Sequence, residues 1–469
     1  MMWSPVITFL LLTLSTICYG ENPGAKILVK EQGLKKGVEY LVNKLMSNNT
    51  EYQLPDVSGS ENIASEDMNY EFTQIRLVKF HHGNILSDWV PETGMHVSME
   101  NGSATINCNW KIDSWLIRDS GRGILTISGL SISMMMGLRR IDPGVPSISL
   151  LDCQSSIHNV DIQMLDGVSY VYESLKQPLQ DVVRATVNRQ LCSAIRSQST
   201  KWDESVSHLQ LNVTLNPFID LDVSLVGNPE ITDSYGCLGL KGLFRTHNES
   251  HSEAAFSPAP LNISIQDGAM IYIGVSQSSL ASLASAYYSA EFLTFQVSHM
   301  EGSKALTTAE LATYIPEISQ HFPNSLPVKI LMYATRTPMV FLHSKNITVQ
   351  FGGSLQANAY SSEAKHESIF SANIVASFQV NMSMSEAIGA RGMNLTASMN
   401  LNRLQIEGSQ PKENKVAVTE KAVQQLIHGL IIPSINENLS RGIFISSSFL
   451  KNATVYPEEG FATLAANIQ

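Results

Sequence analysis

The sequence lacks a long apolar run after its leader, any excess of positive charge, and the motifs typical of hydrolases and metal sites. Its 31 Lys and Arg residues against 42 Asp and Glu give a net charge of −11. An acidic chain is a poor candidate for binding nucleic acid, or for a purely electrostatic hold on anionic membranes. It contains no G-x-S-x-G elbow, no H-E-x-x-H pair and no P-loop, so we expect no catalytic residue, no metal ligand and no enzymatic activity.

Charge is also absent from the first 20 residues, MMWSPVITFLLLTLSTICYG. Their apolar run, 6–17, is shorter than the roughly 20 residues needed to span a bilayer. Small residues follow it at Cys18 and Gly20, where a signal peptidase needs them. We therefore predict a signal peptide over 1–20 and a secreted, extracellular protein; the alternative is a membrane anchor.

Acceptor sequences for N-glycosylation are numerous for one chain. Each N-x-S/T sequence marks an exposed position if it is used. Together with a signal peptide, ten of them predict a glycoprotein. They begin at Asn48, Asn101, Asn212, Asn248, Asn262, Asn346, Asn381, Asn394, Asn438 and Asn452.

Cysteine is scarce. After Cys18 in the leader, only Cys108, Cys153, Cys192 and Cys237 remain. Cysteines outside the cell tend to form disulfides, but four of them allow three complete pairings, and the sequence alone does not choose among these.

The order of periodicities predicts two similar halves. A helix is expected near 34–45, strands with near period two over about 70–166, and a second helix over 169–197 that Pro178 should kink or divide. The alternation of apolar residues changes phase at Gly129, as a β-bulge there requires. Strands and a last helix over about 418–443 repeat this order after the proline-bearing segment FSPAPLNIS. We predict a first domain over 21–245, a linker over 246–265 and a second domain over 266–469.

The helices carry apolar stripes that could line a cavity or form ordinary core. The candidates for a lipid pocket are Leu34, Val38, Leu41, Leu45, Val171, Leu175, Leu179, Val183, Val423, Leu426, Ile427 and Leu430. In this arrangement Cys192 ends the first long helix and Cys153 lies on the strands before it. A disulfide between them would hold helix to sheet and contribute about 3–4 kcal/mol to stability, so we predict that pairing.

Several segments resemble one family. They include NPGAKILVKEQGLKKGVEYL (22–41), LPDVSGS (54–60), LTISGLSIS (125–133), SLLDCQSSIHNVDIQM (149–164), NRQLCSAI (188–195) and IIPSINENLSRGI (431–443). The chain resembles the family of bactericidal/permeability-increasing protein and lipopolysaccharide-binding protein, which includes the plasma lipid transfer proteins. NPEITDSYGCLGLKGLF resembles the family C branch of this fold.

The resemblance implies an α+β fold. We expect an elongated, boomerang-shaped molecule of two barrels, each an antiparallel sheet wrapped around helices, joined by a central antiparallel sheet. It also implies one apolar pocket per half for phospholipid acyl chains, and it matches Cys153 and Cys192 to the family's disulfide. Cys108 and Cys237 lie outside that pair, and their state stays open.

One stretch departs from the endotoxin-binding members, whose first barrel ends in clustered Lys and Arg. Over 107–122, Lys111, Arg118 and Arg122 are offset by Asp113 and Asp119, so the net charge is +1. Such a tip suits a polyphosphorylated ligand poorly. Trp110 and Trp115 are candidates for contact with a membrane interface, the alternative being a packed strand pair.

The sequence thus predicts a secreted lipid-binding glycoprotein of innate defence, with bound phospholipid and no other cofactor. Its expected partners are phospholipids or related lipids, with lipopolysaccharide or a membrane surface as further candidates. The alternatives are a phospholipid or neutral-lipid transfer protein, and an adhesive glycoprotein that holds lipid only for its structure. The ligand and the oligomeric state stay open.

Overall fold

The structure is a computed structural model, which describes residues 22–47, 52–53, 56–63, 66–115, 117–166, 169–247, 257–265, 268–299, 305–362, 365–387, 392–408, 415–446 and 450–468. The predicted signal peptide lies outside them. The fold is α+β, as predicted, and antiparallel sheets dominate it. Among the described residues, no helix has both the length and the apolar character needed to cross a membrane.

The chain forms two compact units. The N unit consists of Val29–Leu209 and Asn228–Cys237. The C unit consists of the described residues up to Leu28, Gln210–Gly227 and Leu238–Ile468. These units interleave along the chain, whereas the predicted domains were consecutive; the boundaries 21–245, 246–265 and 266–469 stay a prediction.

The N unit is built on a seven-stranded sheet in the order β2-β4-β6-β7-β8, with β3 beside β4 and β5 beside β6. Its strands are β2 (Tyr52–Gln53), β3 (Val57–Ile63), β4 (Glu66–His81), β5 (Asn84–Val90), β6 (Gly94–Asp113), β7 (Arg118–Ile141) and β8 (Val145–Leu165). Along β6, alternate residues from Ala104 to Ile112 are buried, because successive side chains of a strand point to opposite faces.

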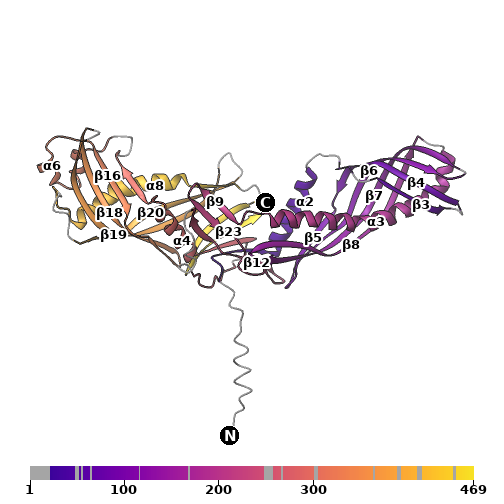
Figure 1. The fold of residues 1–469 in the computed structure, drawn as a ribbon, viewed down its shortest axis with the longest axis horizontal. Helices are drawn as coiled ribbons and strands as arrows, with labels where there is room; N and C mark the ends of the chain where they lie inside the picture. The colour runs from indigo at the N-terminus through magenta and orange to yellow at the C-terminus, as the bar shows by residue number, and fades with distance from the viewer. Residues whose placement is uncertain are drawn as a thin grey trace, which may run out of the picture. The chain divides into compact units, whose positions relative to one another are not determined.

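Two helices complete the N unit. Helix α2 (Glu31–Ser47) packs against β5, and α3 (Ser169–Ser207) runs along β8 (Figure 1). α3 is continuous through Pro178, so the proline does not divide it, and it extends ten residues beyond the predicted end. A tertiary contact supports that extension, because Asp203 Oδ1 accepts hydrogen bonds from Ser147 Oγ (2.8 Å) and Ile148 N (2.9 Å).

The predicted bulge at Gly129 is confirmed. On β6, Gly102 pairs with Leu130 and Ser103 pairs with Ser128, so Gly129 is an extra residue of β7. Its φ of +65° lies in the left-handed region that glycine adopts without strain.

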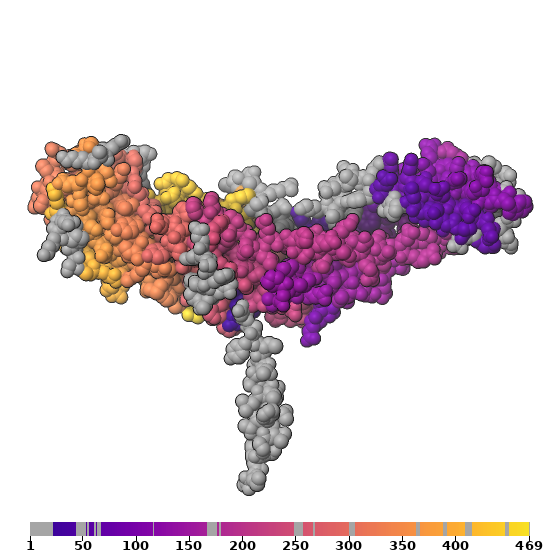
Figure 2. Space-filling view, in the orientation of Figure 1, coloured from indigo at the N-terminus to yellow at the C-terminus, as the bar shows by residue number. Residues whose placement is uncertain are grey.

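The C unit is built on a second seven-stranded sheet in the order β15-β16-β18-β19-β20-β21, with β17 beside β18. The strands are β15 (Thr294–Val297), β16 (Val328–Ala334), β17 (Met339–His343), β18 (Asn346–Ser362), β19 (Lys365–Glu386), β20 (Gly392–Glu407) and β21 (Ile443–Ser446). In Figure 2 the orange surface belongs to residues 305–362, 365–387 and 392–408 of this unit.

The predicted last helix has three segments. They are α7 (Glu420–Leu426), the π-helical η2 (Ile427–Ile431) and α8 (Ile432–Arg441). Two short helices that the sequence analysis did not predict, α5 (Thr308–Leu311) and α6 (Ile318–His321), add to the same core. α4 (Gln277–Ser289) packs against β17 and against β13 (Leu243–Thr246).

A six-stranded sheet draws on the beginning, middle and end of the chain, as predicted for strands from both halves. Its order is β11-β12-β1-β14-β23-β22. These strands are β11 (Glu230–Ile231), β12 (Tyr235–Leu240), β1 (Ala25–Lys30), β14 (Ile271–Ser276), β23 (Phe461–Ile468) and β22 (Leu450–Glu458). A three-stranded sheet contains β13 (Leu243–Thr246), β10 (Ile219–Asp222) and β9 (Asn212–Asn216).

Candidate functional site: an apolar cavity under a stapled helix

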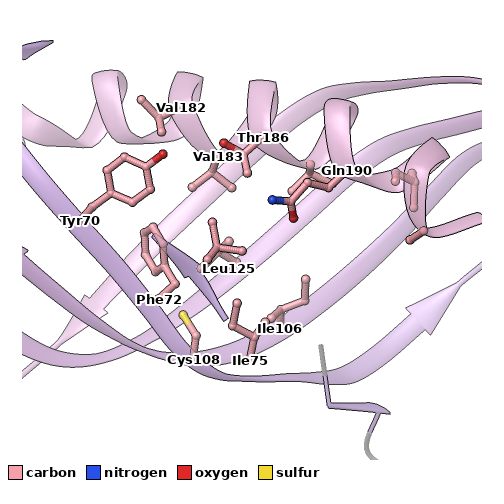
Figure 3. A pocket seen from close by; sticks show the side chains of 14 residues that line it. Tyr70, Phe72, Ile75, Ile106, Cys108, Leu125, Val182, Val183, Thr186 and Gln190 are labelled. Carbon is pink, nitrogen blue, oxygen red and sulfur yellow. The ribbon is translucent and has the colours of Figure 1, made fainter. Parts of the chain in front are cut away.

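An apolar cavity lies in the N unit between α3 and the sheet (Figure 3). Its volume is about 180 Å³, roughly ten times what one buried water needs. The strand side is formed by Val57, Tyr70, Phe72, Ile75, Ile106, Cys108 and Leu125, and the helix side by Val182, Val183, Thr186, Val187, Gln190, Leu191 and Ala194.

The two walls follow from the two periodicities of the sequence. Tyr70 and Phe72 on β4, and Ile106 and Cys108 on β6, are spaced by two and share a face. The helix residues recur at intervals of three and four, which places them on one side of α3. A sheet face and a helix stripe therefore meet with their apolar sides, and their small and branched side chains leave space between them.

A disulfide holds the helix wall in place. The Cys153 and Cys192 sulfurs are 2.11 Å apart, with a Cα–Cα distance of 5.7 Å. Near it, Ser155 Oγ donates to the carbonyl oxygen of Asn188 at 3.2 Å. The prediction that Cys192 ends the helix is wrong, since fifteen residues of α3 follow it. The disulfide thus joins β8 to the helix close to the cavity residues Gln190, Leu191 and Ala194.

Few polar atoms face this space. Cys108 donates weakly to the Gly123 carbonyl oxygen, with Sγ 3.9 Å away, and burial raises the pKa of its thiol to about 11. The thiol is therefore uncharged at neutral pH and suits an apolar wall. Gln190 is exposed, so one edge of the cavity reaches the surface there. An apolar cavity offers water too few hydrogen-bond partners, and it favours an apolar ligand.

Comparison with known proteins agrees with this architecture. The N-terminal domain model of the LBP / BPI / CETP family matches residues 33–209, and its C-terminal domain model matches residues 214–469. The chain belongs to the LBP / BPI / CETP family. This is a family of lipid-binding and lipid-transfer proteins, and the chain is accordingly a lipid-binding protein and not an enzyme.

Individual relatives of this family match over nearly the whole chain. The human BPI fold-containing family C protein is 26% identical over 457 residues, covering 95% of this chain and 89% of the relative. The bactericidal permeability-increasing protein of Sebastes schlegelii is 24% identical, covering 94% and 92%. A crystal structure of lipopolysaccharide binding protein covers 96% of this chain and 99% of its own, with a TM-score of 0.59 and 17% identity.

The twelve predicted pocket residues fall into three groups. From α3, Val183 lines the cavity, whereas the side chains of Val171, Leu175 and Leu179 lie outside the described residues. From α2, Leu34 is buried and Val38 half-buried, Leu41 is 58% exposed, and the side chain of Leu45 lies outside the described residues. Leu34, Val38 and Leu41 are not among the cavity-lining residues, because α2 packs against β5.

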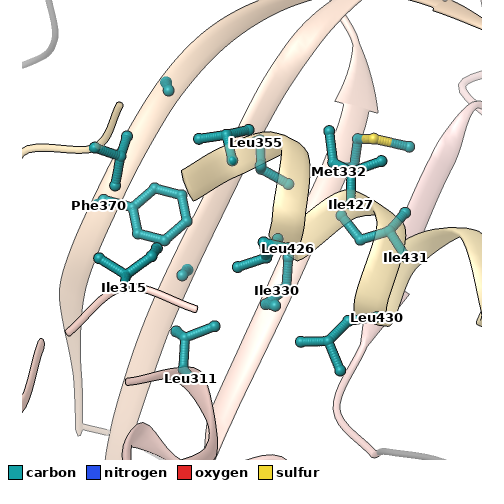
Figure 4. Packing of buried hydrophobic residues seen from close by; sticks show 14 of the residues in the cluster. Leu311, Ile315, Ile330, Met332, Leu355, Phe370, Leu426, Ile427, Leu430 and Ile431 are labelled. Carbon is teal, nitrogen blue, oxygen red and sulfur yellow. The ribbon is translucent and has the colours of Figure 1, made fainter. Parts of the chain in front are cut away.

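The four candidates from the second half lie in the C-unit core. Val423, Leu426 and Ile427 are fully buried and Leu430 nearly so (Figure 4). Leu311 and Ile315, which lie beside them in Figure 4, come from the α5–α6 segment. In the C unit, the apolar face of α7 and η2 is therefore covered by other side chains.

The four predicted tip residues differ in their exposure to solvent. Trp110 was a wrong candidate for membrane contact: it is 2% exposed, because its ring belongs to the N-unit core and its Nε1 donates to the Arg122 carbonyl oxygen at 2.9 Å. Trp115 is 79% exposed in the β6–β7 turn. Lys111 is exposed on β6, and Arg118 pairs with Asp113 at 3.2 Å.

The remaining predicted sites are mostly at the surface. Among the acceptor asparagines, Asn101, Asn212, Asn262, Asn381, Asn438 and Asn452 are exposed, and Asn346 and Asn394 are half-buried. Asn48 and Asn248 lie outside the described residues. Cys108 and Cys237 are both buried thiols.

The strand wall of the cavity was not among the predicted pocket residues. Tyr70, Phe72, Ile106 and Leu125 all lie on segments that it predicted as strands. Their period-two spacing could have nominated them, since residues of one parity share a face. The missing information was which face the long helix covers.

Proposed function

We propose that this protein is a secreted glycoprotein that holds a phospholipid-like ligand, with acyl chains in the N-unit cavity. The observation that carries this proposal is the apolar cavity itself, which reaches the surface beside a polar residue, Gln190. Moving an acyl chain from water into such a space contributes about 25 cal/mol for each Å² of apolar surface removed from water. No other cofactor is proposed.

The proposed extracellular location is supported by the character of the first 20 residues and by six exposed glycosylation acceptors. Relatives are named for bactericidal activity and for lipopolysaccharide binding, which supports a role in innate defence through recognition of bacterial lipids.

The charge at the tip favours a neutral or zwitterionic headgroup over a polyphosphorylated one. Arg118 pairs with Asp113, and Arg122 Nε donates to Asp166 at 2.7 Å. The hydrogen bond from Arg122 holds the pKa of Asp166 below its ordinary value, so this carboxylate keeps its charge beside the arginine. A phosphate group would have to compete with these carboxylates for both guanidinium groups.

A second candidate function, lipid transfer between membranes, is favoured by Trp115. The turn that carries it is closed by Ser114 N donating to Ile117 O at 2.7 Å and Ile117 N donating to Ser114 Oγ at 3.0 Å. An exposed Trp beside these hydrogen bonds suits the headgroup region of a bilayer.

One experiment separates these functions. The purified glycoprotein is mixed with vesicles of labelled phosphatidylcholine and with unlabelled acceptor vesicles. A holding protein takes up lipid stoichiometrically, a transfer protein moves many lipids per chain, and an adhesive protein exchanges none.

The variant Trp115→Ser should slow lipid transfer several-fold without reducing the amount of lipid that the protein holds. If no lipid is taken up and none co-purifies, the proposal fails. Competition by lipopolysaccharide as strong as by phosphatidylcholine would overturn the headgroup preference.

A further inference from the structure

One polar group in the cavity wall lacks a hydrogen-bond partner. Thr186 is 8% exposed, it lines the cavity, and its Oγ1 has no partner among the described residues. Leaving a buried hydroxyl unsatisfied destabilises the folded protein, because the group has lost its hydrogen bonds to water. A Val of the same shape would avoid that cost, and Val182, Val183 and Val187 fill the neighbouring wall positions. The hydroxyl is thus the exception among these four neighbouring positions.

Gln190 lies four residues further along the same helix and also lines the cavity. Residues four apart lie above one another on one side of a helix, about one turn apart. Figure 3 shows both side chains on the side of α3 that faces the strands. Gln190 is exposed, whereas Thr186 is buried, so the two form a polar track that leads from the surface into the cavity.

Around and beyond Thr186 the walls are mainly apolar, with Val182 and Val183 on the helix side. On the opposite side Phe72 and Cys108 are 7% and 6% exposed, and the Tyr70 hydroxyl is a polar exception there. A ligand that follows this path therefore needs a polar end near Gln190, a hydrogen-bond acceptor near Thr186 and hydrocarbon beyond it. Acyl ester lipids have these three parts in that order.

We propose that Thr186 binds the ester carbonyl of an acyl lipid, with Oγ1 donating to the carbonyl oxygen, and that Gln190 contacts the headgroup side of the same molecule. This inference rests on the proposed function, because it presupposes that the cavity holds a lipid. It narrows the ligand class to ester-linked lipids. Ether-linked lipids of equal chain length leave the hydroxyl unpaired.

The test compares two ligands that differ only in this acceptor. Binding of dipalmitoyl phosphatidylcholine and of its dihexadecyl ether analogue is measured on the full chain by displacement of a fluorescent fatty acid. We expect the wild type to prefer the ester about 5- to 10-fold, the range of one hydrogen bond to an otherwise unpaired group. Thr186→Val should abolish this preference by weakening ester binding alone, and Thr186→Ser should restore it.

Two controls keep the outcomes apart. Thr200→Val removes a hydroxyl from an exposed part of α3, where Oγ1 donates to the Arg196 carbonyl oxygen at 3.2 Å, and should leave the preference intact. Without lipid, Thr186→Val should unfold at the same or a higher temperature than wild type. A loss of ester binding in this variant would then not be caused by a loss of folding.

Equal binding of ester and ether lipids, or an unchanged preference in Thr186→Val, overturns the inference and leaves the proposed function standing. Binding of neither lipid overturns both.

Discussion

The two units each place an apolar helix face on a long antiparallel sheet. Among the described residues, an additional segment fills this interface in the C unit and not in the N unit. In the N unit, α3 presents small and branched side chains such as Val183, Thr186 and Ala194 to the cavity. In the C unit, Ile427, Leu430 and Ile431 of η2 belong to a core in which many side chains are fully buried.

The filling segment is the α5–α6 region. Leu311, Ile315 and Ile318 are at most 1% exposed and belong to the same core as η2. Close approach also matters: a Cβ on Gly429 would lie 2.6 Å from Cε1 of Tyr314, so η2 needs glycine there. A helix on a sheet therefore encloses a cavity or a core according to the size of its side chains and to whether a further segment enters the space between them.

The units differ in their covalent support as well. The N unit has the Cys153–Cys192 disulfide, whereas the described residues of the C unit contain no cysteine. A wall that borders open space gains less from side-chain contacts, since atoms facing a void lose their partners. We infer that the disulfide stabilises the wall that side-chain packing supports least.

The largest expected effect comes from removing this support. Cys153→Ala with Cys192→Ala should lower the free energy of unfolding of the N unit by about 3–4 kcal/mol, because the unfolded chain regains the entropy of a long loop. All described tryptophans (Trp89, Trp110, Trp115 and Trp202) lie in the N unit, so their fluorescence reports its unfolding in denaturant. Hydrogen exchange of C-unit peptides is the control and should not change; equal loss in both units would show that the disulfide has no local role.

A somewhat smaller effect is expected from truncating the filling segment. Leu311→Ala should destabilise the C unit by about 3 kcal/mol, because a fully buried Leu leaves a cavity behind. The matched change Leu191→Ala in the N unit should cost only about 1 kcal/mol, since Leu191 is half-buried and already borders open space. Hydrogen exchange in each unit measures both. Equal costs would contradict the contrast between a filled and an open interface.

The smallest effect is a change in labelling rate at Cys108. Only the thiolate reacts, and a pKa raised from 9.0 to about 11 keeps the thiol protonated at neutral pH. Alkylation by iodoacetamide should therefore rise about tenfold per pH unit up to about pH 11, instead of levelling off near pH 9. Bound phospholipid should slow it further. The Cys237 peptide in the same digest is the internal control, because Cys237 is buried but not among the cavity-lining residues.

The raised pKa of Cys108 also determines how the stability of the N unit depends on pH. Between about pH 9 and 11, the unfolded chain releases the Cys108 proton while the folded chain keeps it. The contribution of this group to stability is therefore complete below pH 9 and is lost as the pH rises toward 11.

Much of the architecture could be predicted from period and spacing. The Gly129 bulge and the long helix after the strands follow from local pattern. The extension of α3 to Ser207 could not, because it depends on Asp203 reaching a distant strand. The α5–α6 segment was missed because helices of four residues are too short to show periodicity.

The candidate site was predictable only in part. An apolar stripe looks the same whether it borders a cavity or a core, so Val183 and Val423 could not be told apart. Trp110 and Trp115 flank one turn, yet one is buried and the other exposed. Strand parity would have predicted that Trp110 is buried, because Trp110 lies on the same face of the strand as Ile106, Cys108 and Ile112.

The most direct test of the central claim is native mass spectrometry of the secreted protein with lipid extraction, on wild type and on Val187→Phe. The larger side chain should occupy the cavity, whereas Ala185→Phe places the same ring on an exposed position of α3 outside the cavity lining. We expect a phospholipid on wild type and on Ala185→Phe, and at least a tenfold loss of it, about 1.4 kcal/mol, in a folded Val187→Phe. A wild type without lipid, or a Val187→Phe variant that keeps its lipid, would contradict it.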